Sequence, residues 1–79
     1  MDRDRALMRG VAARDDAAFT ELVERYGGRL LAVARRLLQT DADAEDAVQR
    51  AFLQCYLGAA GYRPEFAVST WLYRILTNL

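Results

Sequence analysis

The sequence predicts an all-α protein, a small four-helix bundle with three long helices and one short N-terminal helix. Every long stretch places apolar residues at helical spacing, and none alternates as a half-buried strand would. The only proline, Pro64, lies in a glycine-containing segment outside these stretches. With 79 residues and a single cysteine, the chain is close to the lower size limit for a domain that folds without disulfides. We therefore expect one domain over residues 1–79.

The first helix is predicted over residues 4–13, and its apolar side consists of Leu7, Met8 and Val11. A helix of this length is marginal in water when isolated. We therefore expect it to pack against the rest of the chain.

The second helix is predicted over residues 16–39, with Asp15 as N-cap because a carboxylate there can accept free backbone N–H groups of the first turn. Gly27 and Gly28 each cost up to about 1 kcal/mol relative to alanine, so we expect a bend at this point. The apolar stripe of this helix is continuous and contains Phe19, Leu22, Val23, Tyr26, Leu30, Val33, Ala34 and Leu37.

Three arginines, Arg25, Arg29 and Arg36, share a narrow arc beside this stripe. They form either a solvated flank or a ridge that faces phosphates. The eleven basic residues balance eleven acids, so net charge gives no signal for nucleic acid. All eleven are arginine, which suits planar hydrogen bonding to phosphates, bases or carboxylates, although a GC-rich coding bias gives the same count.

The third helix is predicted over residues 44–57, with Asp43 and Asp46 as a capping arrangement at its start. Its core-facing arc contains Ala44, Ala47, Val48, Ala51, Phe52 and Cys55.

The opposite arc of this helix combines an acid and an amide with large apolar side chains: Asp46, Gln49, Leu53, Tyr56 and Leu57. Such a mixture on the outside of a small domain indicates a docking surface. The alternative is that the first or the fourth helix covers Leu53 and Leu57.

Residues 58–67 are predicted to form a loop, in which the Arg63-Pro64 step keeps the backbone extended. Its aromatic and basic side chains, Tyr62, Arg63 and Phe66, serve either ordinary packing or a pocket for an unstacked base. The last helix then starts near Ser69, which we expect to cap it. Its core arc contains Trp71, Leu72, Ile75, Leu76 and Leu79, and its other arc contains Thr70, Tyr73, Arg74, Thr77 and Asn78.

The composition argues against catalysis and against a metal site. There is no histidine, and Cys55, the only cysteine, lies in an apolar helical pattern typical of a core residue. No nucleophile–base pair with histidine can form, and no glycine motif matches a phosphate-binding loop. We therefore expect no cofactor, and binding rather than chemistry. No apolar run is long enough to span a bilayer, and the charged N-terminus is unlike a signal peptide, so an intracellular location is expected.

Binding of unpaired bases fits the last helix and the loop before it. Aromatic rings stack on bases, arginine contacts phosphates or base edges, and asparagine pairs with a base edge. The strings DAEDAVQRAFLQCYL and YRPEFAVSTWLYRILTNL, in this order and at this spacing, resemble the second conserved region of bacterial extracytoplasmic-function sigma factors. These proteins are the small alternative specificity subunits of RNA polymerase. The string LMRGVAARDDAAFTELVERYGGRLLAVARRLL is similar to the family's opening helices, so the resemblance covers essentially the whole chain.

The resemblance implies two binding surfaces. The third helix would dock on the coiled-coil clamp of the polymerase's largest subunit through Glu45, Asp46, Gln49 and Leu53. The loop and last helix would recognise and open the promoter −10 element. In that arrangement Tyr62, Arg63 and Phe66 hold a flipped non-template base, and the junction of paired and unpaired DNA meets Trp71, Tyr73, Arg74 and Asn78. Because Trp71 lies at the edge of the core arc, packing is an equally good interpretation for it.

The sequence departs from the family pattern at two positions. Arg50 stands where the family often has an acid, which puts that part of the polymerase contact in doubt. Leu72 follows Trp71 where primary sigma factors carry a second tryptophan, which implies a narrower range of promoters opened.

The resemblance also implies partners and a larger parent protein. We expect the last helix to continue beyond Leu79, the −35-binding domain to be absent from this chain, and an anti-sigma factor to bind the protein. The expected location is the bacterial cytoplasm, or the inner membrane through that anti-sigma factor. The alternative function is a sigma-like decoy that binds an anti-sigma factor without binding DNA.

Overall fold

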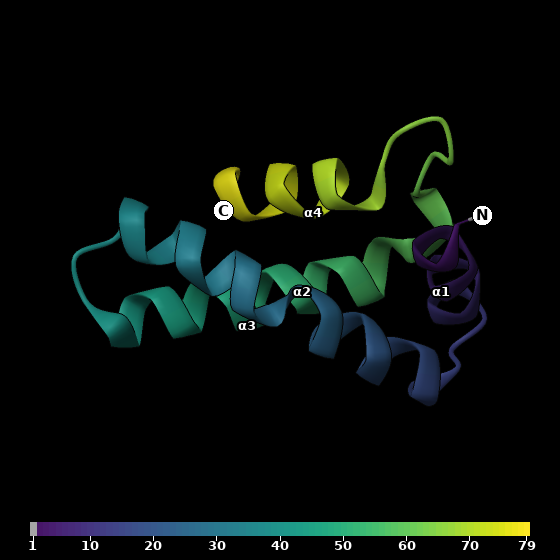
Figure 1. Ribbon diagram of the computed structural model, residues 1–79, viewed down its shortest axis with the longest axis horizontal. Coiled ribbons are helices and arrows are strands. Elements are labelled where there is room, and N and C mark those ends of the chain that lie inside the picture. The colour runs from purple at the N-terminus through teal and green to yellow at the C-terminus, as the bar shows by residue number, and fades with distance from the viewer. Residues whose placement is uncertain (1) are drawn as a thin grey trace.

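A computed structural model describes residues 2–79 and contains the expected all-α bundle. Its helices are α1 (Arg3–Ala12), α2 (Asp16–Leu37), α3 (Asp41–Gly58) and α4 (Val68–Thr77), with a short 3₁₀ helix η1 (Ala59–Gly61) after α3. Helices α2 and α3 run antiparallel, α4 lies along this pair, and α1 packs at the end where α2 begins (Figure 1). The fold class is confirmed, although α4, at ten residues, is as short as α1.

Side-chain caps mark the starts of α1, α2 and α3, and two of the predicted caps are wrong. Asp15 caps α2 as expected, since its Oδ1 accepts from Ala17 N at 3.0 Å. Helix α3 begins at Asp41, three residues before the predicted start, because the Thr40 hydroxyl accepts from Asp43 N at 3.1 Å. Thr40 lies just outside the helix, and its hydroxyl satisfies the backbone N–H of Asp43. Asp43 is therefore a residue of the first turn and not the cap.

The cap of α4 and the end of α2 also differ from the sequence-based expectation. Helix α4 begins at Val68 after Ala67, which provides no side-chain cap, and Ser69 lies inside the helix. Helix α2 ends at Leu37 and runs through Gly27 and Gly28 without a break in its secondary structure.

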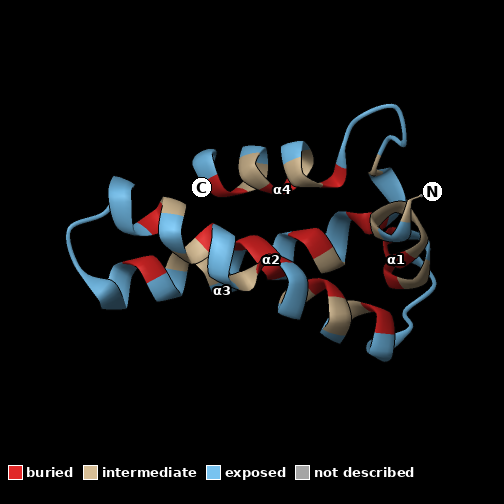
Figure 2. Cartoon of the chain, in the orientation of Figure 1, coloured by how far each residue is buried: buried red, intermediate tan, exposed pale blue. Residues whose placement is uncertain are grey.

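The buried core follows the predicted apolar arcs of all four helices (Figure 2). The expected side of α1 is buried, as are Leu22, Tyr26, Leu30 and Ala34 of α2, Ala44, Ala51, Phe52 and Cys55 of α3, and Leu72 and Leu76 of α4. Two predicted core leucines are exposed instead: Leu37, at 59%, is the last residue of α2, and Leu79, at 45%, lies beyond the end of α4 at Thr77.

A close crossing fixes α1 against α2. A Cβ added to Gly10 would lie 2.6 Å from the Ala18 Cβ, so only glycine allows this approach. Arg14 then adopts a φ of 63°, and Arg14 N and Asp15 N donate to Val11 O and Gly10 O, both at 2.9 Å. This is the Schellman pattern, with arginine in the place that glycine usually takes.

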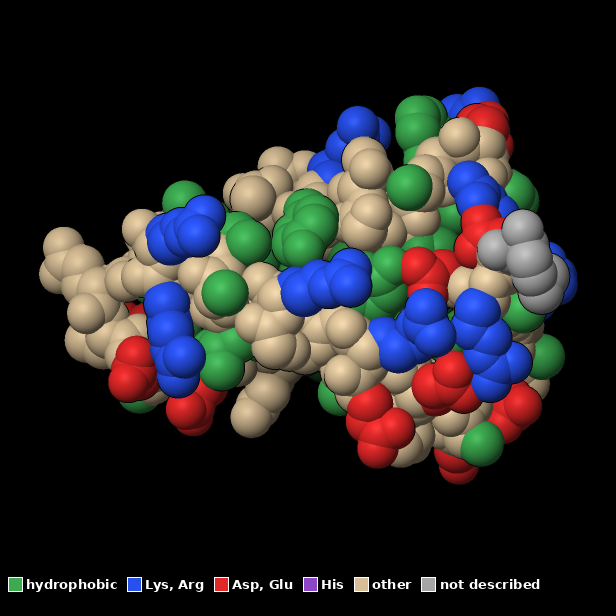
Figure 3. All heavy atoms as spheres, in the orientation of Figure 1, with side chains coloured by type: hydrophobic (Ala, Val, Ile, Leu, Met, Phe, Trp, Pro, Cys, Tyr) green, Lys and Arg blue, Asp and Glu red, His purple; other side chains and the backbone are tan. Residues whose placement is uncertain are grey.

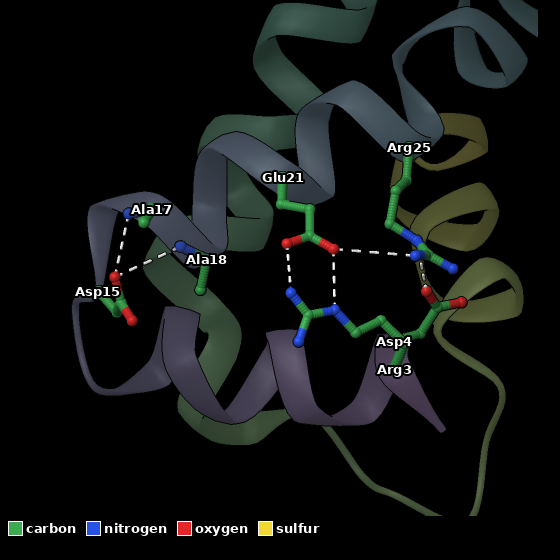
Figure 4. A network of polar contacts seen from close by, with 7 residues as sticks. All are labelled: Arg3, Asp4, Asp15, Ala17, Ala18, Glu21 and Arg25. Carbon is green, nitrogen blue, oxygen red and sulfur yellow. Dashed lines mark hydrogen bonds and ion pairs between the residues drawn. The ribbon is translucent and has the colours of Figure 1, made fainter. Parts of the chain in front are cut away.

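Charged side chains reinforce the same contact (Figure 4). Arg3 Nε donates to a Glu21 carboxylate oxygen at 2.9 Å, and Arg25 Nε lies 3.1 Å from Asp4 Oδ1. The buried Tyr26 donates its hydroxyl to the other Asp4 oxygen. The start of α1 is therefore held on α2 by both packing and ion pairs, which matters because the loop described below rests on α1.

No helix within residues 2–79 is both long and apolar enough to cross a bilayer.

Candidate nucleic-acid and protein interfaces

The loop before α4, residues 62–67, which we call the Phe66 loop, is held in shape by hydrogen bonds. Phe66 N donates to Arg63 O at 3.0 Å and closes a turn. The Tyr62 hydroxyl donates to the Phe66 carbonyl. From α1, Arg5 Nε donates to Pro64 O at 2.6 Å and Arg5 Nη2 to Phe66 O at 3.2 Å. The loop is therefore braced from inside and from a distant part of the chain.

The aromatic side chains of this region divide into a packed pair and an exposed ring. Tyr62 and Trp71 are half-buried and meet edge to face, with ring centroids 5.3 Å apart. Phe66 is exposed, and the guanidinium carbons of Arg63 and Arg74 lie 5.8 and 5.7 Å from its ring centroid. Trp71 thus has a packing role in this structure, and Phe66 is the ring most available for stacking.

The outer side of α4 faces away from the core, as the sequence predicts. Leu72 and Leu76 are buried, whereas Arg74 and Asn78 are exposed and Tyr73 is half-buried. Asn78 ends the helix, and its backbone N–H donates to Arg74 O at 3.1 Å. In Figure 3 the surface over α4 shows arginine but no acidic side chain, and along this edge acidic side chains appear only at the loop.

One acid interrupts this basic surface. Glu65 accepts from Arg63 Nε at 3.1 Å and lies 2.9 Å from Arg63 Nη2. Both side chains are more than half exposed, and exposed ion pairs contribute about 0–1 kcal/mol. The Arg63 guanidinium can therefore leave Glu65 for a phosphate or a base at small cost.

The outer face of α3 is exposed over all four predicted polymerase-contact residues, Glu45, Asp46, Gln49 and Leu53. Leu53 and Leu57 have exposed fractions of 56% and 64%, so the alternative that another helix covers them is wrong. Beside Leu53, an apolar groove between α2 and α3 is lined by Phe19, Val23, Gln49, Phe52, Leu53 and Tyr56.

The electrostatics of this α3 face are altered by Arg50. Arg50 Nη1 lies 3.7 Å from Asp46 Oδ2, one turn away on the same helix. The arginine therefore offsets the charge of Asp46, while Glu45 and Gln49 are one turn apart on the other side of the face.

Two of the three arginines that share the predicted arc of α2 are engaged within the protein. Arg25 pairs with Asp4, and the Arg29 guanidinium carbon lies 5.2 Å from the Tyr26 ring centroid. This favours the flank interpretation over the phosphate-facing ridge.

Titratable groups in the core take no part in either surface. Burial raises the pKa of the Cys55 thiol to about 12, which leaves it a packed, unreactive side chain. Burial, with a hydrogen bond to Asp4, raises the pKa of Tyr26 to about 12. The described residues contain no group of three or more histidine, cysteine or acidic side chains that could hold a metal.

Two residues at these surfaces were missed by the sequence analysis. Arg5 braces the Phe66 loop across 61 positions of sequence, and no local pattern signals such a contact. Arg14 lies over the Tyr56 ring at 4.3 Å and donates to the Tyr56 carbonyl, beside the α3 groove. The sequence gives one signal for Arg14: it precedes the Asp15 cap, at the point where the preceding helix is expected to end with a left-handed residue.

Comparisons with known proteins find one family over most of the chain. The chain matches the family Sigma-70 region 2 over residues 22–79. It is 40% identical over 75 residues to the ECF RNA polymerase sigma factor SigM of Mycobacterium tuberculosis, a match that covers 95% of this chain and 38% of SigM. It is 37% identical to the ECF RNA polymerase sigma-E factor of Haemophilus influenzae, over 95% of this chain and 39% of that protein.

A solved structure is similar over nearly the whole chain. It is an NMR structure of an engineered region 2 of sigmaE in complex with GTAAAA, with a TM-score of 0.85 and 35% sequence identity. The match covers 95% of this chain and 78% of that one. The chain spans less than half the length of the curated relatives named above.

Proposed function

Because this chain belongs to the Sigma-70 region 2 family and its relatives are sigma factors of the extracytoplasmic-function type, we propose that it docks on core RNA polymerase and recognises and melts the promoter −10 element. Sigma factors are transcription initiation factors and not enzymes. The work of strand opening is therefore done by binding energy, which must favour separated strands over the duplex.

The DNA-binding part of the proposal rests on the exposed Phe66 ring, which lies between the guanidiniums of Arg63 and Arg74. Hydrogen bonds fix the shape of the loop that carries this ring. An exposed ring provides a stacking surface for a base, worth about 1–3 kcal/mol, and two guanidiniums beside it suit the adjoining phosphates. In our proposal Tyr62 holds the loop rather than stacking on DNA, since its hydroxyl bonds the Phe66 carbonyl and its ring packs on Trp71.

Asn78 and Tyr73 extend this surface along α4 toward the C-terminal end. Arg74 and Asn78 are one turn apart on the exposed side, with Tyr73 at its margin. In our proposal they meet the junction of paired and unpaired DNA, and Trp71 contributes by packing against Tyr62. A relative of 35% identity that was solved in complex with GTAAAA supports nucleic-acid binding by this fold.

The polymerase part rests on the α3 face formed by Glu45, Asp46, Gln49 and Leu53. Exposed leucine beside carboxylates and an amide suits the mixed surface of a helical partner, which we propose is the clamp coiled coil of the largest subunit. We further propose that the protein acts in the bacterial cytoplasm. An anti-sigma factor covering the α3 face would compete with polymerase and could hold the protein at the inner membrane.

The test uses holoenzyme assembled from core polymerase and the protein that contains this chain. Asn78→Ala and Arg74→Ala should each reduce promoter opening, measured by permanganate reactivity of unpaired thymines, and leave polymerase affinity unchanged. Gln39→Ala, which removes an exposed amide in the turn between α2 and α3, is the control for Asn78→Ala and should open promoters normally. Normal opening by both variants would contradict the proposal and favour a sigma-like decoy that binds only proteins.

A further inference from the structure

The Phe66 loop has one contact that no part of the proposed DNA surface explains. Arg5, on the first turn of α1, reaches the loop and donates two hydrogen bonds to its backbone, to Pro64 O and Phe66 O. Neither carbonyl is part of a helix, so each needs a partner from elsewhere or from water. A charged donor makes this contact stronger than an ordinary hydrogen bond.

The guanidinium of Arg5 is itself fixed in orientation. Its Nη1 pairs with Asp2 Oδ2, while Nε and Nη2 point at the two loop carbonyls. Asp2 is in turn held as the N-cap of α1, since its Oδ1 accepts from Arg5 N at 3.1 Å. All three nitrogens of the rigid, planar Arg5 guanidinium are therefore engaged, and the guanidinium links the start of α1 to the loop.

The second carbonyl in this contact belongs to Phe66, the residue that carries the exposed ring. Phe66 O accepts from both Arg5 Nη2 and the Tyr62 hydroxyl, and Phe66 N closes the turn to Arg63 O. With its N–H and carbonyl both bound, the backbone of Phe66 cannot move without breaking one of these bonds. A loop fixed in its binding conformation loses less entropy when a ligand binds.

We propose that Arg5 is a positioning residue for DNA recognition: it fixes the Phe66 loop in the conformation that presents the Phe66 ring and Arg63 to an unpaired base. This inference rests on the proposed function. It extends that function to α1, whose residues lie outside both predicted binding surfaces. Asp2 has a part in the same positioning role, because it orients the Arg5 guanidinium.

Arg9 provides a matched control because it lies one turn further along α1. Both arginines line a shallow hollow beside the loop, whose other walls are Met8, Ala12, Ala59, Ala60, Tyr62 and Pro64. Arg9 is exposed, and replacing it removes the same charge from the wall of the same hollow. A purely electrostatic attraction of DNA would affect the two variants equally.

The first experiment measures binding of single-stranded DNA of sequence GTAAAA by fluorescence anisotropy, at several salt concentrations. Arg5→Ala should lower the affinity by about tenfold, as expected for loss of charge-assisted hydrogen bonds that hold the loop, and Arg9→Ala by less than about twofold. The slope of log affinity against log salt should be the same for Arg5→Ala and the parent. A lost phosphate contact would instead reduce that slope by roughly 0.7.

Arg5→Lys separates charge from geometry. Lysine keeps the positive charge but cannot bond two carbonyls and Asp2 in one plane, so its affinity should resemble that of Arg5→Ala. Full recovery with lysine, or a reduced salt slope in Arg5→Ala, would overturn the positioning role in favour of a simple charge effect.

A second measurement reads the loop without DNA. In Arg5→Ala, amide hydrogen exchange at residues 62–67 should rise well above that of the parent, while exchange in α3 stays unchanged. Trp71 is the only tryptophan and packs on Tyr62, so its emission should also shift. Unchanged loop exchange overturns the inference. A parent chain that binds no single-stranded DNA overturns the proposed function instead, and with it the recognition role of Arg5.

Discussion

The Phe66 loop and the outer face of α3 are both exposed, but they are held in place by different means. The loop takes its shape from the bond of its own Tyr62 hydroxyl and from two helices, through Arg5 of α1 and the contact of Tyr62 with Trp71 of α4. The α3 face is shaped by the hydrogen bonds of its own helix backbone, and Glu45 and Leu53 project from it directly.

This difference predicts how each surface responds to substitution. A helix keeps its face when one exposed side chain is lost, so only residues that contact a partner should affect binding there. A loop depends on bonds made from outside, so residues that never touch the ligand should also matter. The two surfaces can therefore be separated by variants that affect one partner and leave the other unchanged.

The largest effect is expected at Leu53, because a carboxylate in the middle of an apolar contact is costly to desolvate. Leu53→Asp should weaken binding to core polymerase by roughly 30-fold, the size of a typical hot-spot loss of about 2 kcal/mol. It should leave affinity for single-stranded GTAAAA unchanged. Both are measured by anisotropy with labelled protein or labelled DNA.

Leu38→Asp controls for this substitution. Leu38 is also an exposed leucine, but it lies at the α2–α3 turn, outside the predicted contact. It should bind polymerase like the parent. Equal weakening by the two variants would mean that the α3 face is not the docking surface.

The next largest effect is expected at Phe66. Phe66→Ala should reduce the affinity for single-stranded DNA by about tenfold, because base–aromatic stacking contributes about 1–3 kcal/mol. Phe66→Tyr keeps the ring and should bind like the parent. Polymerase affinity should be unchanged in both, and a drop in Phe66→Ala would show that the loop and the α3 face are not independent.

The sequence predicted the parts of both surfaces that depend on local spacing. The exposed arc of α3 and the outward side of Arg74 and Asn78 follow from helical periodicity, and the structure has both. The predicted start of α3 was wrong because Thr40 and Asp43, three residues apart, can each cap the helix. The structure uses the Thr40 hydroxyl, which lies outside the acidic run.

The contacts that brace the loop had no comparable signal in the sequence. Arg5 and Phe66 come together only because α1 packs at the end of α2 and the loop returns to it, which is a property of the whole fold. The same holds for Trp71, whose position on the wheel allowed either packing or stacking. The structure shows that Trp71 packs, because the Tyr62 ring lies against it.

The smallest effect concerns Arg50, which tests whether charge or shape dominates on the α3 face. Arg50 lies beside Asp46 and offsets its charge, and the pair contributes at most about 0.5 kcal/mol to stability because both side chains are exposed. Arg50→Glu frees Asp46 and adds a second acid. If the partner surface is basic, affinity for core polymerase should rise about two- to fivefold at low salt, and this gain should disappear as ionic strength increases.

Arg36→Glu makes the same charge change on α2, away from the α3 face, and separates a local effect from one of net charge. It should alter polymerase affinity by less than Arg50→Glu does. Weaker binding in Arg50→Glu would mean that Arg50 itself contacts the polymerase. The polymerase contact would then depend on Leu53 and Gln49, with the acidic contribution reduced to Glu45.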